Sequence, residues 1–156
     1  MDYRQKARLN QDKSMRIKHM AFAVKSVDEA LLNFQSFLSV SPKTEKVIWE
    51  KAETKVAIFF INDIEFQLCE SLNKQGRFTE WIEKYGEGLH HICYEVDDIE
   101  SASQTLQAAG ARVLGDGTAK IGAHGNPVLF LHPKDFNGTM IELEQVAATS
   151  ERPQAE

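Results

Sequence analysis

The alternation of apolar and polar residues predicts the same order of elements twice along the chain. Residues 16–24 alternate bulky and small apolar side chains, as expected of a strand with one face in a core. The segment Ser26-Val27-Asp28-Glu29 has the form of a capping box, and a helical spacing of apolar residues follows over 30–38. Three further strands are predicted at 45–51, 54–61 and 64–70, with Asn62-Asp63 as a tight turn.

The second half repeats this order after a linker that contains a short predicted helix around 77–84. Each half therefore has the order β-α-β-β-β. We predict an α+β fold in which two paired modules form a cupped, incomplete mixed barrel with helices outside. The predicted elements of the second half are strands at 89–96, 111–114, 126–132 and 138–145, and a helix at 98–109 that Gly110 ends.

These elements divide the chain into a polar N-terminal arm, one domain and a flexible tail. The arm is residues 1–15, the domain is 16–145 and the tail is 146–156. Within the domain we expect module 1 at about 16–70, the linker at 71–88 and module 2 at about 89–145.

Each half contributes one His and one further polar residue at matching places. His19 and His91 lie near the start of the first strand of their modules, and Gln67 and Glu142 lie on the closing strands. Because side chains alternate between the faces of a strand, all four are predicted on the face turned away from the helices. Two imidazoles, a carboxylate and an amide oxygen suit one divalent metal ion (Co, Zn, Mn, Ni or Fe), which keeps open positions for substrate and acts as a Lewis acid.

Each of these residues also has a purely structural interpretation. A single His at a strand start is usually a surface or capped residue. Glu142 taken alone fits a solvated sheet edge, because Glu144 has the same parity. The matching parity in both halves favours the metal site. By the same parity His90 is predicted to face away from the site and to be structural.

Composition narrows the class of protein. The chain has 156 residues and a net charge of −5, and it contains no run of basic residues interleaved with aromatics, so we expect no nucleic-acid partner. Its longest apolar run, 56–61, is far too short for a membrane span, and the charged first 15 residues do not resemble a signal peptide. The two cysteines lie in different halves, which favours a reducing, cytoplasmic setting.

Three segments resemble a known family: IKHMAFAV, GLHHICYEVDDI and KIGAHGNPVLFLHPKDFNGTMIELEQ. They resemble the vicinal oxygen chelate superfamily (glyoxalase, bleomycin resistance proteins and dioxygenases), and within it the methylmalonyl-CoA epimerases, over roughly 17–145. The resemblance implies His19, Gln67, His91 and Glu142 as metal ligands, with Glu142 also a catalytic base. Some epimerases carry a second basic carboxylate on the third strand, where this chain has Ile58. The second base therefore stays open, with Glu50, Glu53 and Glu65 nearby in the sequence.

The leading hypothesis is a metal-dependent epimerase of a 2-substituted malonyl-CoA-type thioester that acts through a stabilised enolate. In the loop Gly122-Ala123-His124-Gly125, backbone amides between glycines are expected to receive the substrate carboxylate, although the loop also fits a simple turn. Gly122, His124 and Gly125 are thus candidate substrate-binding residues. The expected partner is a small acyl-CoA or other acyl thioester, and the expected assembly is a homodimer.

Other functions remain compatible with the same fold. The alternatives are glyoxalase I (lactoylglutathione lyase) and an isomerase of another acyl thioester. A dioxygenase is less favoured, because Gln67 occupies a fourth ligand position. A non-catalytic binding protein of the superfamily is also less favoured, because such proteins generally lack the full ligand set.

Overall fold

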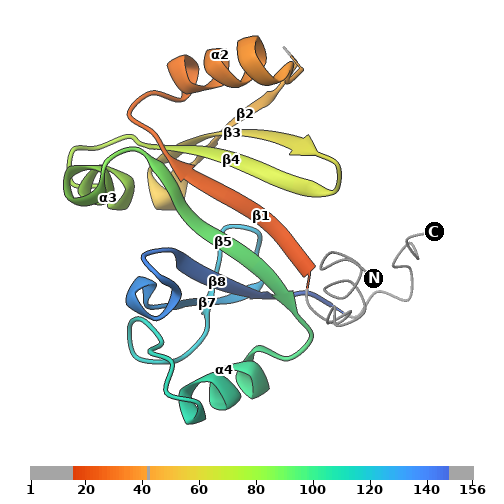
Figure 1. Ribbon diagram of the computed structural model, residues 1–156, viewed down its shortest axis with the longest axis vertical. Helices are drawn as coiled ribbons and strands as arrows, with labels where there is room; N and C mark the ends of the chain where they lie inside the picture. The colour runs from red at the N-terminus through yellow and green to blue at the C-terminus, as the bar shows by residue number, and fades with distance from the viewer. Residues whose placement is uncertain (1–15, 42, 148–156) are drawn as a thin grey trace, which may run out of the picture.

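The computed structural model describes residues 16–41 and 43–147, in which eight strands form one open sheet (Figure 1). The strand order is β2-β3-β4-β1-β5-β8-β7-β6. The strands are β1 (Arg16–Ala23), β2 (Glu45–Trp49), β3 (Thr54–Ile61), β4 (Ile64–Ser71), β5 (Gly88–Val96), β6 (Lys120–Ile121), β7 (Pro127–Leu131) and β8 (Met140–Gln145). The helices are α2 (Val27–Leu38), α3 (Arg77–Tyr85) and α4 (Ile99–Ala108), with 3-10 turns at Glu50–Ala52 and Pro133–Phe136.

The sheet has the same arrangement on both sides of its centre. The first strands of the two halves, β1 and β5, pair antiparallel in the middle. Each then pairs in parallel with the last strand of its own half, β1 with β4 and β5 with β8. The remaining strands continue outward in antiparallel pairs. The predicted mixed architecture of two β-α-β-β-β halves is therefore confirmed.

Helices α2 and α4 cover the outer face of the sheet, one in each half (Figure 1). The Ser26 side chain accepts a hydrogen bond from the Glu29 amide at the start of α2, as the capping pattern predicts. Val27 and Leu31 of α2 are buried against Leu68 of β4. In the second half α4 packs through Ile99 on a cluster from β7 and β8. No helix in 16–41 or 43–147 is both long and apolar enough to span a membrane.

The linker helix α3 packs on the opposite face of the sheet. Its Phe78 is fully buried against Ala21, Ala23 and Cys69, which share the face of the predicted metal ligands. The small side chains of β1 leave the volume that this phenyl ring fills. The helix thus closes one end of the face on which the site lies.

Two single-residue irregularities interrupt the pairing of β1 with β5. Ile17 pairs with Tyr94 but His19 pairs with Cys93, so that Lys18 is an extra residue on β1. On β5 the extra residue is His90, because Ala21 pairs with His91 and Phe22 with Leu89. Each of these bulges directly precedes one of the two candidate His ligands. A bulge breaks the alternation of faces, so parity does not fix where Lys18 and His90 point.

Two predicted strands differ in the structure. The strand predicted at 45–51 ends at Trp49, because a 3-10 turn follows and Glu53 adopts a left-handed conformation with φ of 45°. The segment 111–114 forms only one isolated bridge, from Val113 to Leu131. The short strand β6 instead lies just before the glycine-containing loop.

Candidate metal centre and active site

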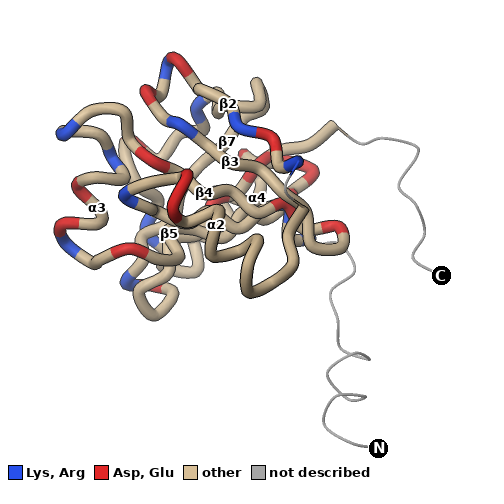
Figure 2. The backbone as a smooth tube through the Cα atoms, turned by 90° about the horizontal axis from the view of Figure 1, so that it is seen from above, with Lys and Arg blue, Asp and Glu red and all other residues tan. Residues whose placement is uncertain are grey.

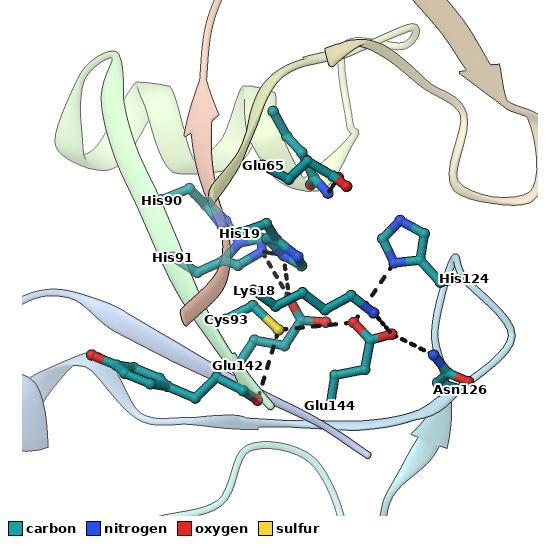
Figure 3. Close-up of polar contacts among 12 residues, drawn as sticks. Lys18, His19, Glu65, His90, His91, Cys93, His124, Asn126, Glu142 and Glu144 are labelled. Atoms are coloured by element: carbon teal, nitrogen blue, oxygen red, sulfur yellow. Dashed lines mark hydrogen bonds and ion pairs between the residues drawn. The ribbon is translucent and has the colours of Figure 1, made fainter. Parts of the chain in front are cut away.

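The three central strands bring His19, His91 and Glu142 together in the interior (Figure 3). Glu142 Oε2 lies 2.9 Å from His19 Nε2 and 2.9 Å from His91 Nε2. The two Nε2 atoms are 3.0 Å apart. These atoms form a nearly equilateral triangle. Because all three side chains are buried, the triangle is shielded from solvent.

The shape and chemistry of this triangle fit a divalent metal ion. Bond lengths of about 2.1 Å to imidazole nitrogen and carboxylate oxygen place neighbouring ligand atoms of an octahedral site about 3 Å apart. The three observed separations of 2.9, 2.9 and 3.0 Å match one face of such an octahedron. Two nitrogens and one oxygen are also a donor set that borderline divalent metals prefer.

Gln67 lies on β4 and lines the same cavity as these three residues. Its side-chain nitrogen Nε2 donates a hydrogen bond of 2.6 Å to Glu65 Oε1. A carboxylate accepts hydrogen bonds and donates none, so this contact fixes which end of the Gln67 amide faces Glu65. The amide oxygen of Gln67 is thereby left as a donor atom for a metal. Glu65, considered from sequence only as a base, has a contact that orients Gln67.

The protonation states of Glu142 and His91 are those that metal ligands require. Burial alone raises the pKa of Glu142, but its close contacts with His19 and His91 outweigh burial and hold that pKa well below its usual value. Burial lowers the pKa of His91, against the opposing effect of Glu142. At neutral pH the carboxylate is therefore ionised and the His91 imidazole is neutral, as metal binding requires.

His90 lies beside the site, contrary to the prediction from parity. Its Nδ1 lies 2.8 Å from His91 Nδ1, and its ring packs against Phe78 and Trp81 of α3. The bulge at His90 explains the failure, because the extra residue displaces its side chain from the regular alternation. Burial, and next the neighbouring His91, lower the pKa of His90 to about 3, so its imidazole is neutral.

A second polar cluster surrounds Glu144, two residues beyond Glu142 on β8 (Figure 3). Glu144 Oε1 accepts hydrogen bonds from Lys18 Nζ (2.6 Å) and Asn126 Nδ2 (2.7 Å), and Oε2 lies 3.6 Å from His124 Nδ1. Burial raises the pKa of Glu144, but contacts with His124, Lys18 and Asn126 bring it down to about 2. Glu144 is only 1% exposed, so the interpretation of this strand as a solvated edge is wrong.

The glycine-containing loop is closed by hydrogen bonds between its own backbone groups. The Gly122 amide donates to the Asn126 carbonyl and the Gly125 amide donates to the Gly122 carbonyl. Both of these amides are used within the loop, and the expectation that amides between the glycines receive a substrate carboxylate stays a prediction. A side chain at position 122 would lie 2.7 Å from Val128, and Gly125 has φ of +80°, so both glycines have structural roles.

All seven predicted site residues border one cavity of about 650 Å³, a size typical of small-molecule sites. His124 borders it from the loop, with its ring near those of His19 and Trp49. A second cavity of about 510 Å³ shares Arg77, Lys120, Val128 and Phe130 with the first. The lining of the first cavity is His19, Trp49, Glu50, Lys51, Ala52, Gln67, Arg77, Phe78, His91, Lys120, Ile121, Gly122, Ala123, His124, Gly125, Val128, Phe130 and Glu142.

The carboxylates that the sequence suggested as a second base differ in where they lie. Glu50 borders the main cavity. Glu53 is outside its lining, and its Oε2 accepts a hydrogen bond from Asn73 Nδ2. Sequence reasoning did not select Lys18, Arg77 or Lys120. The parity that Glu144 shares with Glu142 was the one signal in the sequence that pointed to the second cluster.

Both cysteines are expected to be unreactive in the folded protein. Cys69 and Cys93 are buried. Burial raises the pKa of Cys69 to about 12 and also raises that of Cys93, so at pH 8 both stay as thiols rather than nucleophilic thiolates. Iodoacetamide should label neither within minutes in buffer and both in guanidinium, as read by intact mass. Rapid stoichiometric labelling of the native protein would contradict this environment.

Comparison with known proteins places this chain in a family. Residues 18–130 match the model of the Glyoxalase/Bleomycin resistance protein/Dioxygenase superfamily. The chain belongs to this superfamily. It is 42% identical over 134 residues to the ethylmalonyl-CoA/methylmalonyl-CoA epimerase of Cereibacter sphaeroides, covering 84% of this chain and 98% of that protein. It is 35% identical over 133 residues to the mitochondrial methylmalonyl-CoA epimerase of Homo sapiens, covering 83% and 73%.

Solved structures of the superfamily show the same fold. A variant of Streptomyces coelicolor methylmalonyl-CoA epimerase in complex with 2-nitronate-propionyl-CoA superposes with a TM-score of 0.72 at 29% identity, covering 88% of this chain and 98% of that one. A methylmalonyl-CoA epimerase in complex with methylmalonyl-CoA and NH4+ gives a TM-score of 0.72 at 29% identity, covering 90% and 100%. The resemblance stated from the sequence motifs is therefore confirmed.

Proposed function

We propose that this protein is a metal-dependent epimerase of a 2-substituted malonyl-CoA-type thioester. The observation that carries the proposal is the buried triangle of His19 Nε2, His91 Nε2 and Glu142 Oε2 on a cavity of substrate size. The 42% identity to an ethylmalonyl-CoA/methylmalonyl-CoA epimerase, over nearly all of that protein, supports the substrate class.

In this proposal His19, Gln67, His91 and Glu142 hold one divalent ion, for which Co, Zn, Mn, Ni and Fe are all chemically suitable. When bound, the ion acts as a Lewis acid that stabilises the negative charge of an enolate. The side chains of the chain supply the geometry. The contact of Glu65 with Gln67 orients the amide, and burial keeps water away from the ligands.

The reaction needs a base that removes the proton from the carbon between the thioester carbonyl and the carboxylate. Glu142 is ionised and borders the cavity. Its Oε2 belongs to the triangle, and its other oxygen, Oε1, is the atom to which we assign the proton. Inversion also requires a proton donor on the opposite face of that carbon. The titratable side chains that border the cavity besides the ligand set include Glu50, Lys120 and His124.

The region around the site suits an acyl-CoA. Arg77 and Lys120 border both cavities, and Lys84 borders the second. Arg77 and Lys84 belong to α3, along which basic residues are interspersed with acidic ones (Figure 2). There they can meet the phosphates of CoA. On β3 Ile58 pairs with Gln67, so this position supplies no carboxylate beside the site. The homodimer and the cytoplasmic setting stay predictions.

Substrate class is tested by supplying malonyl-type thioesters and, separately, the hemithioacetal of methylglyoxal and glutathione to the purified protein. In deuterated water, (2S)- or (2R)-methylmalonyl-CoA should exchange its C2 proton and invert, and ethylmalonyl-CoA is the second malonyl-type substrate to test. Methylglyoxal plus glutathione should give little lactoylglutathione. Strong lactoylglutathione formation without C2 exchange would overturn the proposal in favour of glyoxalase I. Exchange without inversion would indicate that the enolate forms but that no side chain donates a proton to the opposite face of C2.

A further inference from the structure

The His91 imidazole is engaged through both of its nitrogens. Nε2 points into the metal triangle, 2.9 Å from Glu142 Oε2 and 3.0 Å from His19 Nε2. Nδ1, on the other side of the ring, lies 2.8 Å from Nδ1 of His90. Both residues are buried, with 5% of His90 and 4% of His91 exposed. The bulge therefore joins two successive imidazoles by an N–H···N hydrogen bond.

Such a hydrogen bond has only two neutral arrangements. In one, His91 carries its proton on Nδ1 and donates it to His90, so that Nε2 of His91 is bare. In the other, His90 donates and His91 carries its proton on Nε2, where it blocks a metal. Only the first arrangement makes His91 a ligand through the nitrogen that faces Glu142 and His19.

We propose that His90 is a positioning residue that holds His91 in the tautomer with a bare Nε2. The proposal rests on the metal site of the proposed function and adds a residue that does not touch the metal. It requires His90 itself to carry its proton on Nε2, with Nδ1 as the acceptor. A partner of this kind fixes both the orientation and the basicity of a metal-bound imidazole.

The surroundings of His90 show how its ring is held in place. It packs against Phe78 and Trp81, with ring centroids 4.8 Å and 4.5 Å away. Helix α3 therefore supports the metal site indirectly, through His90. This gives the linker helix a role beyond closing one end of the site.

The first half of the chain lacks this device. Its bulge residue is Lys18, whose Nζ binds Glu144 and not His19. Within the described part of the chain, Nδ1 of His19 is the one buried side-chain polar atom without a hydrogen-bond partner. The two duplicated halves have thus diverged at equivalent bulges, and only His91 has its outer nitrogen held by a neighbouring side chain.

Two substitutions separate the hydrogen bond from the packing. His90→Leu removes the acceptor, and an apolar side chain suits the aromatic surroundings. His90→Asn places an amide oxygen near the position of Nδ1 and keeps an acceptor. We expect His90→Leu to weaken Zn2+ binding about 10–100-fold, the usual cost of removing such a partner. His90→Asn should stay near the wild-type affinity. Competition with a chromophoric chelator measures both, and thermal melting checks that both variants fold.

A direct observation of the wild-type protein does not depend on any variant. With Zn2+ bound, 15N-histidine NMR should show the proton of His91 on Nδ1 and that of His90 on Nε2. A scalar coupling between the two Nδ1 nuclei should report the hydrogen bond. A proton on Nδ1 of His90, or equal Zn2+ affinity in wild type and His90→Leu, would overturn the role of His90 alone. A wild-type chain that binds no Zn2+ would overturn the metal site and this role together.

Discussion

Replacing Glu142 with Gln is expected to lower the rate of C2 proton exchange by about 10²–10⁴-fold, the range for loss of a general base. The amide keeps the size of the side chain and one oxygen that can bind metal, but it cannot take up a proton at neutral pH. Metal content should therefore be retained in part while turnover nearly disappears. The two quantities are measured on the same sample, by elemental analysis and by NMR of the substrate in deuterated water.

Glu144→Gln is the matched control for this prediction. Glu144 lies on the same strand with the same parity and is also buried, but its Oε1 accepts hydrogen bonds from Lys18 and Asn126, outside the triangle. Its metal content should stay near that of the wild type. If Glu142→Gln still epimerised at nearly the wild-type rate, the base would lie elsewhere in the cavity, and Glu50 would become the first carboxylate to test.

His91→Ala should abolish both stable metal binding and activity. It removes one of two imidazole ligands and opens a gap beside Glu142, whose charge then loses a close partner. Metal affinity should fall by more than about 10–100-fold, which is the usual effect of removing a residue that only hydrogen-bonds to a ligand. Equilibrium dialysis against Zn2+ or Co2+ measures the loss. Full metal content together with full turnover would exclude this residue from the site.

His132→Ala is the corresponding control among the other histidines. His132 accepts a hydrogen bond from the Lys134 amide at the start of a 3-10 turn, and it is outside the lining of the cavity. Its removal should leave metal affinity unchanged. His90→Ala is expected to lie between these two variants, since His90 contacts the ligand rather than the metal.

The positions of the candidate ligands were largely predictable from the sequence because these residues follow the alternation of strand segments that lie just beyond the bulges or have none. His19, Gln67, His91 and Glu142 each lie on a strand that the apolar pattern predicts, and all four border the cavity. The duplication then places the two halves about a common centre. This combination predicted both the fold and the set of residues that meet.

The failures occur where the regular pattern is broken by contacts distant in sequence. A bulge forms from the pairing of two strands, so the position of His90 could not be read from β5 alone. The way the glycine-containing loop closes could not be predicted either, because it depends on the Gly122 amide donating to the Asn126 carbonyl. The position of α3 depends on the burial of Phe78 against the face formed by β1 and β4.

The central claim is that a metal held by the duplicated ligands acidifies C2 of a malonyl-type thioester, with Glu142 as the base. The most direct test removes the metal with a chelator and follows loss of the C2 proton signal of methylmalonyl-CoA in deuterated water. We predict no exchange above background in the stripped protein. Exchange should then return with one equivalent of Co2+ or Mn2+ and saturate there. Undiminished exchange after complete removal of metal, or none after its return, would contradict the claim.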